Sequence, residues 1–276
     1  MTMTLPIPDF SRLAPPAGYR LAITGGCGGI GRRLTEVAAA EGLRIAVIDL
    51  PGSLERHALP AGVETLPYDA RDDESAAQAF AGLAEAWGGA LDGLVHLPGY
   101  MSPPKPVEDM TAAEIDEALS VNLRSAFLAV KAALPMLRKG AGETGNASGM
   151  VIAASGLATL VEKTTGTYSA AKAGIIALAK GLAKENAPEV RANCIAPGAV
   201  DTAFLRGGTG RGGDVTPKNE QDFPAGMDNS AMLATIPLGR IAVTDDIVGP
   251  VLFLLSEKAR FMTGQTLYIN GGRLMV

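Results

Sequence analysis

The stretch Thr24-Gly25-Gly26-Cys27-Gly28-Gly29-Ile30-Gly31 stands between a short apolar segment and a helical repeat. Residues 20–24 are predicted to form a strand, and residues 29–41 carry apolar side chains at helical spacing. Glycines permit a sharp turn, and the N-terminus of a helix offers free N–H groups to a pyrophosphate. The glycines fit three different spacings and are weak evidence alone. The flanking strand and helix favour a dinucleotide-binding turn.

An acidic residue, Asp49, closes a second predicted strand at 44–48. A carboxylate at this place is expected to grip the ribose hydroxyls of a dinucleotide. A 2′-phosphate would meet like charge there, which costs up to roughly 4 kcal/mol per unit pair at about 4 Å. Leu50 follows Asp49, while Arg32 and Arg33 lie on the helix after the turn, so no offsetting cation is evident. The sequence therefore predicts NAD(H) rather than NADP(H).

Far along the chain, Ser155 precedes the run Tyr168-Ser169-Ala170-Ala171-Lys172. Side chains four apart on a helix are neighbours, which puts the phenol and the ammonium on one face. A free tyrosine has a pKa of about 10, and a nearby cation favours the phenolate. A Tyr/Lys pair alone is usually a pair of surface neighbours. With Ser155 and the upstream dinucleotide turn, it predicts proton transfer to a carbonyl or from an alcohol.

Strand and helix patterns alternate along the chain. Strands are expected at 20–24, 44–48, 63–66, 91–97, 149–154, 190–196 and 266–270, and helices at 29–41, 73–87, 111–138, 167–186 and 244–256. Continuously apolar strands are typical of a parallel sheet covered by helices on both faces. We expect an α/β fold, a Rossmann-type doubly wound parallel sheet of about seven strands. Polar and glycine residues that follow its strands should meet at one edge: Asp49, Asp69, Gly99, Ser155, Pro197 and Gly198.

Composition excludes several classes of protein. The net charge of −5 argues against a nucleic-acid partner, and no window approaches the ~20 apolar residues of a membrane span. Cys27 and Cys194 suggest no disulfide framework, and sparse His and Cys argue against a metal site. Residues 1–18 are proline-rich without a basic start, so we interpret them as a loose leader. Residues 19–276 are expected to form one cytoplasmic catalytic domain.

Together these segments resemble the classical short-chain dehydrogenase/reductase (SDR) family from Arg20 to Gly272. The matching motifs are Thr24-Gly25-x-x-x-Gly29-Ile30-Gly31, Asp69-Ala70, Ser120-Val121-Asn122-Leu123, Ser155, Tyr168-x-x-x-Lys172, Pro197-Gly198-Ala199-Val200-Asp201-Thr202 and Gly264-Gln-Thr-Leu-Tyr-Ile-Asn-Gly-Gly272. Their order and spacing are specific, and they favour the glycine register 25, 29 and 31. The resemblance also supports NAD(H), because relatives that use NADP often carry Arg or Lys where Gly28 stands.

The resemblance implies a role for each catalytic residue. Tyr168 is expected to be the general acid/base, and Ser155 to hydrogen-bond the substrate oxygen. Lys172 would also hold the nicotinamide ribose, and Asn122 would anchor a water that links Lys172 to solvent. The residues expected to bind the cofactor are Gly25, Cys27, Gly28, Gly29, Ile30, Asp49, Asp69, Ala70, Gly99, Tyr168, Lys172, Pro197, Gly198, Val200 and Thr202. Asp69 has an alternative role in capping a loop, and Thr202 in starting a helix.

One segment departs from the family. Members commonly carry Asn-Asn-Ala-Gly where this chain reads His96-Leu97-Pro98-Gly99. Pro98 removes a backbone donor, and the loss of both Asn side chains puts hydrogen bonding around the fourth strand in doubt. His96 has an unperturbed pKa near neutrality, but a structural role is favoured over titration.

Residues 203–235 form a long polar segment that we interpret as a substrate lid. Its basic and acidic residues interleave, which favours a solvated lid over an anion site. The substrate stays open among keto-acyl thioesters, cyclic alcohols, polyols and steroids. The leading hypothesis is an oxidoreductase acting on a secondary alcohol or ketone. Alternatives are an idle dinucleotide-binding sensor and a lyase or isomerase. Helices apolar on most faces, at 121–137 and 167–186, predict a homotetramer or at least a dimer.

Overall fold

A computed structural model describes residues 10–102, 104–205 and 229–276. Seven parallel strands form one sheet in the order β3-β2-β1-β4-β5-β6-β7. The strands are β1 (Arg20–Thr24), β2 (Arg44–Asp49), β3 (Glu64–Pro67), β4 (Gly93–His96), β5 (Ser148–Ala153), β6 (Val190–Pro197) and β7 (Thr266–Ile269). The order reverses between β1 and β4, which opens a crevice at the carboxyl ends of the strands. The predicted doubly wound parallel sheet is confirmed.

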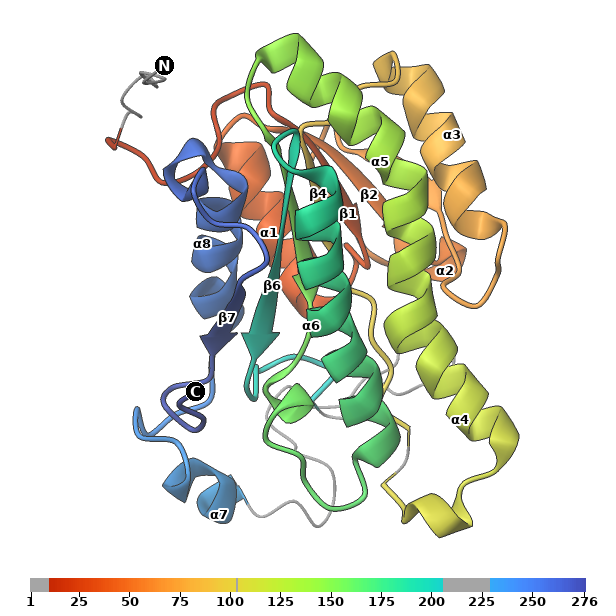
Figure 1. Cartoon of the computed structure of the whole chain (residues 1–276), viewed down its shortest axis with the longest axis vertical. Helices are drawn as coiled ribbons and strands as arrows, with labels where there is room; N and C mark the ends of the chain where they lie inside the picture. Colours follow the sequence, from red (N-terminus) through yellow and green to blue (C-terminus); the bar gives the residue numbers. More distant parts are fainter. Residues whose placement is uncertain (1–9, 103, 206–228) are drawn as a thin grey trace.

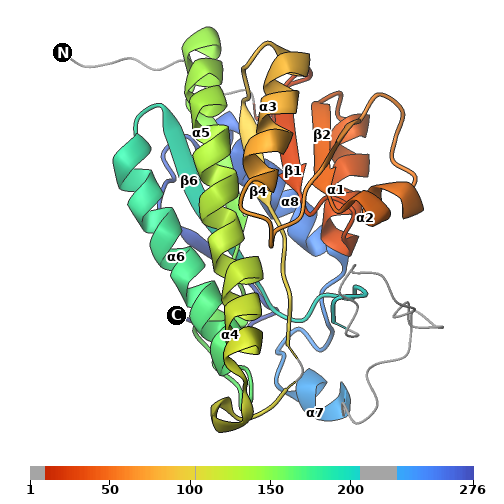
Figure 2. The same cartoon turned by 90° about the vertical axis from the view of Figure 1, so that its right-hand side faces the viewer.

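Helices cover both faces of the sheet (Figures 1 and 2). They are α1 (Gly29–Ala40), α2 (Pro51–Arg56), α3 (Ser75–Trp87), α4 (Ala112–Leu119), α5 (Ser125–Thr144), α6 (Gly166–Asn186), α7 (Asn229–Ala234) and α8 (Thr244–Leu255). One hydrophobic core lies between the sheet and α3, α5 and α6, and a second lies between the sheet and α1 and α8. Because both faces are covered, all eight residues of β6 are buried.

Local sequence explains where several helices begin and end. Thr111 and Glu114 form a capping box at the start of α4: the Glu114 N–H donates to Thr111 Oγ1, and the Thr111 N–H donates to Glu114 Oε2. Gly88 and Gly145 end α3 and α5 with φ values of 65° and 70°, a conformation that favours glycine. These signals fix the lengths of the helices that flank the crevice.

The predicted helix at 111–138 differs most from the structure. A π-helical turn, η2 (Ser120–Arg124), separates α4 from α5, and α5 continues to Thr144. The short helices α2 and α7 were not predicted, because six residues give too little periodicity. Short 3₁₀ turns are η1 (Val107–Asp109), η3 (Gly156–Ala158) and η4 (Glu257–Ala259). The strands were predicted to within about two residues.

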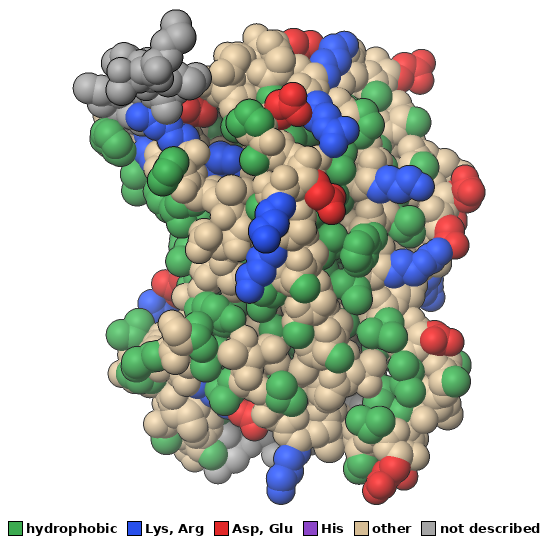
Figure 3. Space-filling model, viewed as in Figure 1, with side chains coloured by type: hydrophobic (Ala, Val, Ile, Leu, Met, Phe, Trp, Pro, Cys, Tyr) green, Lys and Arg blue, Asp and Glu red, His purple; other side chains and the backbone are tan. Residues whose placement is uncertain are grey.

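Half of the predicted leader, residues 1–9, and most of the predicted lid, residues 206–228, lie outside the described residues. In the described part of the chain, no helix is both long and apolar enough to cross a membrane. On the face shown in Figure 3, Lys and Arg side chains are interspersed with Asp, Glu and hydrophobic groups.

Candidate active site

The glycine turn between β1 and α1 has little room for side chains. Gly25 has a φ of +72°, and a Cβ at Gly31 would lie 2.6 Å from the Gly25 carbonyl oxygen. A Cβ at Gly29 would lie 2.7 Å from Thr202 Cγ2, whereas one at Gly28 would have ordinary contacts at 3.4 Å. The tightest positions therefore include the predicted register of 25, 29 and 31. Gly28, which precedes α1, has no side chain to cap its first N–H groups, so the turn fits a pyrophosphate.

Asp49 ends β2 beside this turn. Its Oδ2 accepts a hydrogen bond from the Cys27 N–H at 2.7 Å, and its Oδ1 accepts one from the Leu50 N–H at 2.7 Å. Burial raises the pKa of the Asp49 carboxyl, and the two N–H donors oppose that rise by favouring the carboxylate. The carboxylate is therefore held in one orientation, facing the backbone of the glycine turn.

Basic side chains lie closer to this place than the sequence indicated. Burial raises the pKa of the Cys27 thiol to about 12, and the charges of Arg32 and Arg56 oppose that rise. Arg32 Nη1 lies 3.4 Å from His57 Nδ1. The charges of Arg32 and Arg56 therefore act on the turn that carries Cys27, and His57 is the basic group that lowers the Asp49 pKa against the rise caused by burial.

The predicted proton-transfer group is brought together after β5. Tyr168 and Lys172 occupy successive turns of α6, both buried, and Lys172 Nζ lies 5.9 Å from the centre of the Tyr168 ring. Ser155 lies beside the Tyr168 hydroxyl, and Ser155 Oγ accepts from the Leu157 N–H at 3.2 Å. The Lys172 ammonium donates to the carbonyl oxygen of Ala153 at 2.9 Å. The phenol, the hydroxyl and the ammonium thus share one site at the carboxyl edge of the sheet.

Burial dominates the ionisation of this group. It raises the pKa of Tyr168 to about 12, with the neighbouring Ser155 hydroxyl opposing the rise. It lowers the pKa of Lys172 to about 8. From the sequence, a nearby cation was predicted to lower the Tyr168 pKa. In the protein alone the direction is the opposite, because removing the phenolate from water outweighs the neighbouring groups.

Asn122 lies in η2, at the point where α4 passes into α5. Its Oδ1 accepts from the Tyr100 N–H at 2.9 Å, and its Nδ2 donates to the carbonyl oxygens of Tyr100 and Ala118. The side chain therefore holds the segment after β4 against η2. Its predicted role as a water anchor for Lys172 stays a prediction.

Comparisons with known proteins show the family of this chain. A family model described as enoyl-(acyl carrier protein) reductase matches residues 25–273. The 2-(S)-hydroxypropyl-CoM dehydrogenase 3 of Xanthobacter autotrophicus is 34% identical over 91% of this chain and 95% of its own length. A probable galactose dehydrogenase of Rhizobium meliloti is 32% identical over 98% of this chain and 99% of its own. The chain belongs to the classical short-chain dehydrogenase/reductase family.

The solved structure of an aldohexose dehydrogenase from Thermoplasma acidophilum has the same fold as this SDR protein. The two share 25% identity over 96% of each chain, with a TM-score of 0.77. The family, its oxidoreductase class and its Rossmann-type sheet are therefore shown, as the sequence predicted.

The fold of this SDR protein shows how His96 is accommodated where family members commonly carry Asn. His96 is buried, with Nδ1 at 2.8 Å from Thr24 Oγ1 and Nε2 at 3.2 Å from Ser125 Oγ. Burial, with a smaller effect of the Lys172 charge, lowers the His96 pKa to about 3, so the imidazole is neutral. His96 therefore supplies hydrogen bonds at the end of the fourth strand, in keeping with the favoured structural role, while hydrogen bonding to the adenosine ribose stays untested.

Other predicted cofactor residues have contacts within the chain. Asp69 pairs with Arg71 at 2.6 Å and accepts from the Arg71 N–H, which is the loop-capping alternative. Thr202 Oγ1 donates to the Val200 carbonyl oxygen at 3.3 Å, and residues 201–205 form turns rather than a helix. Ala70 is buried, and the Gly198 N–H donates to the Ile269 carbonyl oxygen. Their cofactor contacts remain predictions.

Phe204 was not among the predicted site residues. Its ring centre lies 6.4 Å from that of Tyr168, and a Cβ at Gly99 would lie 3.5 Å from its Cε2. The available signal was a single aromatic residue two positions after Thr202. Phe204 therefore lies beside both the predicted acid/base and the segment after β4.

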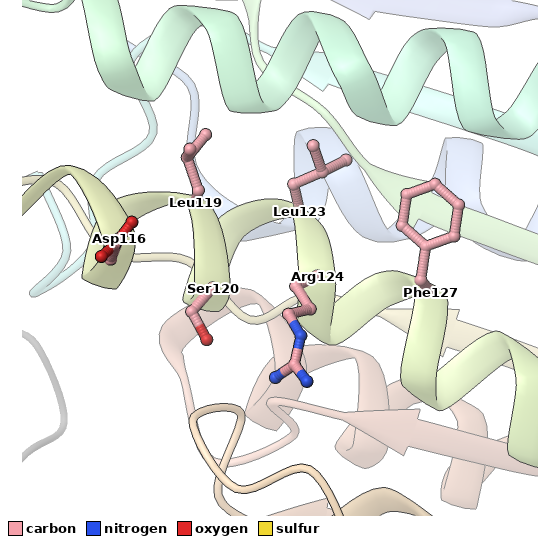
Figure 4. Close-up of a pocket in the computed structure, with 6 residues that line it drawn as sticks. All are labelled: Asp116, Leu119, Ser120, Leu123, Arg124 and Phe127. Atoms are coloured by element: carbon pink, nitrogen blue, oxygen red, sulfur yellow. The ribbon is translucent and has the colours of Figure 1, made fainter.

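A separate groove of about 460 Å³ lies on α4, η2 and α5 (Figure 4). Leu119, Leu123 and Phe127 point to the same side of this helical run, and half of the Phe127 surface is exposed. The groove contains none of the predicted catalytic side chains, so it is a surface feature distinct from the candidate active site.

Proposed function

We propose that this protein is an NAD(H)-dependent oxidoreductase that transfers hydride between nicotinamide and a secondary alcohol or ketone. The observation that carries the proposal is the buried Tyr168, with Ser155 beside its hydroxyl and the Lys172 ammonium 5.9 Å from the centre of its ring. Two relatives, named as a 2-(S)-hydroxypropyl-CoM dehydrogenase and a probable galactose dehydrogenase, support an alcohol or carbonyl substrate. A bound nicotinamide supplies the hydride chemistry.

The roles of the chain's own residues follow from their chemistry. Tyr168 gives a proton to the substrate oxygen in reduction and takes it back in oxidation. Ser155 orients the substrate oxygen against Tyr168 by a hydrogen bond. A cationic Lys172 favours the phenolate and lowers the cost of ionising a buried phenol. A positively charged nicotinamide ring would lower the cost of ionising Tyr168 further. The protein without cofactor lacks this charge.

The preference for NAD(H) rests on Asp49. Its carboxylate lies at the end of β2 and has lone pairs left for two ribose hydroxyls. A 2′-phosphate would be repelled by the carboxylate, although Arg32 and Arg56 reduce that repulsion. We expect the carboxylate to dominate, because it sits at the end of the strand while both guanidinium groups belong to the flanking helices.

We also propose a homotetramer in which helices α5 and α6 pair across subunits. The support is the apolar groove on α4, η2 and α5 and the exposed ring of Phe127. Leu119, Leu123 and Phe127 gather on one side of this helical run, and a contiguous exposed apolar patch marks a surface that binds another protein. The cytoplasmic location indicated by composition stays a prediction.

The function is tested by following NADH absorbance with a panel of ketones and alcohols. Tyr168→Phe should bind NADH like the parent while turnover falls about 10²- to 10⁴-fold. Tyr19→Phe is the matched control, because it removes the hydroxyl of another tyrosine, one that donates to the Asp92 carbonyl oxygen outside the site, and should keep the parent rate. A Tyr168→Phe rate within about twofold of the parent would exclude Tyr168 as the acid/base. Firm NADH binding without turnover of any substrate would favour the sensor alternative.

A further inference from the structure

His96 joins two parts of the site that are far apart in the sequence. It is the last residue of β4 and pairs in register with Thr24, the last residue of β1. Its ring continues to Ser125, the first residue of α5. One buried side chain therefore spans from the strand that leads into the glycine turn to the helix that follows η2.

The distances in this group fit one direction of hydrogen bonding, with the tautomer of His96 assigned from its partners. Ser125 Oγ donates to the Val121 carbonyl oxygen at 2.7 Å, so it accepts from His96 Nε2. A neutral imidazole that donates from Nε2 accepts at Nδ1, which takes the proton of the Thr24 hydroxyl. The chain of bonds runs from Thr24 through His96 and Ser125 to Val121, and each polar group in it has a partner.

The segment that follows His96 contacts both halves of the site. Pro98 lies against the glycine turn, since a Cβ at Gly25 would be 2.9 Å from the Pro98 nitrogen. The Pro98 carbonyl oxygen accepts from Lys172 Nζ at 3.4 Å. Tyr100, two residues on, is held by the Asn122 side chain. A shift of His96 would therefore move groups that contact the cofactor turn, the catalytic lysine and Asn122.

We infer that His96 is a positioning residue that holds the glycine turn and η2 in register through Thr24 and Ser125. This inference rests on the proposed function. The Asn that family members commonly carry would reach about as far as the imidazole Nδ1 and so would contact Thr24 alone. The second link, to Ser125, belongs to the imidazole of this chain.

The hydrogen bonds of His96 to Thr24 and to Ser125 can be removed one at a time. An Asn side chain reaches about as far as the imidazole Nδ1, and a Gln side chain reaches about as far as Nε2. His96→Asn keeps a partner for Thr24 and loses Ser125, so NADH affinity should stay near the parent value while kcat falls. His96→Gln keeps a partner for Ser125 and loses Thr24, so NADH affinity should fall more than kcat. Each loss should be roughly fivefold to tenfold, the equivalent of one hydrogen bond.

Ser125→Ala gives a second route that leaves the imidazole in place. Like His96→Asn, it should lower kcat and leave NADH affinity near the parent value. The double variant with His96→Asn and Ser125→Ala should be no slower than either single variant, since both substitutions remove the same hydrogen bond. Ser148→Ala is the matched control: Ser148 is also buried and donates to a helix carbonyl, that of Leu137, outside the group. Its NADH affinity and kcat should match the parent.

The readouts are the NADH dissociation constant from fluorescence titration, kcat and KM, and the thermal midpoint. The positioning role is supported if His96→Asn mainly lowers kcat and His96→Gln mainly lowers NADH affinity. Lower midpoints with unchanged affinity and kcat would overturn it and leave His96 as a structural residue. If the proposed function is wrong, the parent protein binds NADH but turns over none of the ketones and alcohols of the panel. In that case equal NADH affinities of the Asn and Gln variants would still overturn the inference.

Discussion

The hydroxyl groups of Thr159 and Tyr268 lie 2.8 Å apart and join the loop after Ser155 to β7. In the same loop, Glu162 pairs with Arg273 at 2.8 Å. The chain between Ser155 and Tyr168 is thus tied at two points to the C-terminal segment. Both ends of this loop carry proposed catalytic residues, so its shape bears directly on how a substrate is held.

Removing the hydrogen bond between Thr159 and Tyr268 should weaken substrate binding. Thr159→Val loses the hydroxyl and should raise the substrate KM about fivefold, the equivalent of one hydrogen bond, with NADH affinity unchanged. Thr159→Ser keeps the hydroxyl and is the matched control. Steady-state kinetics with the best substrate of the panel give the KM of each variant. Equal KM values for Thr159→Val and Thr159→Ser would show that the hydrogen bond to Tyr268 does not affect substrate binding.

Asp49 should set the cofactor preference. We expect the parent to favour NAD(H) over NADP(H) by at least about a hundredfold in kcat/KM, and Asp49→Ala to relax this ratio, because the like-charge repulsion is removed. Asp245→Ala, which removes a carboxylate at the start of α8, should leave the ratio unchanged. Equal or better turnover of NADP(H) by the parent would refute this prediction.

Lys172 should make cofactor affinity depend on pH. Burial lowers its pKa to about 8, so the ammonium is charged below that pH and neutral above it. NADH affinity should therefore fall as pH rises through about 8. Lys172→Ala should bind NADH more weakly, turn over more slowly and lose this pH dependence. Fluorescence titrations from pH 6 to 10 test the prediction, which fails if the parent's affinity is flat across that range.

His96 should make folding stability depend on pH. Its pKa is about 6.5 in an unfolded chain and about 3 in the folded one, where burial favours the neutral ring. Between these values only the unfolded state binds the proton, so stability falls as pH drops, by up to about 1.4 kcal/mol per pH unit.

Urea unfolding at pH 7 and pH 5 measures this dependence. His96→Asn should lose less stability over that interval than the parent. The lowered pKa values of Glu114 and Asp246 act in the same direction in both proteins, and so cancel in the comparison. Equal losses in parent and variant would mean that His96 titrates normally in the folded state.

The apolar groove of Figure 4 should be covered in solution. Phe127→Glu puts a charge on its half-exposed ring position and should convert the proposed tetramer to smaller species, since burying a charge without a partner is costly. Gln78→Glu adds the same charge on the exposed face of α3 and should leave the assembly intact. Light scattering at micromolar concentration distinguishes these, and a parent monomer of 28.3 kDa would defeat the prediction.

Much of the fold could be predicted because its signals are local. Apolar runs marked the strands, and Gly31 is constrained by contacts with Gly25 and Gly26 in its own turn, whereas Gly25 and Gly29 are constrained by the distant residues Pro98 and Thr202. The Tyr168 and Lys172 pair follows from helical spacing. What was missed depends on contacts distant in sequence. His96 and Ser125 are 29 positions apart with no pattern linking them, and the Tyr168 pKa depends on how completely the folded chain removes the phenol from water.

The π-helical turn at Ser120–Arg124 acts as a one-residue insertion between α4 and α5. One residue of an α-helix corresponds to about 100° of rotation, so this insertion sets the angular phase between the two helices. That phase turns the Asn122 carboxamide inward to Tyr100 while the Phe127 ring faces out. Deleting any single residue of the turn would let an unbroken α-helix form, and one of these two faces would then point the wrong way.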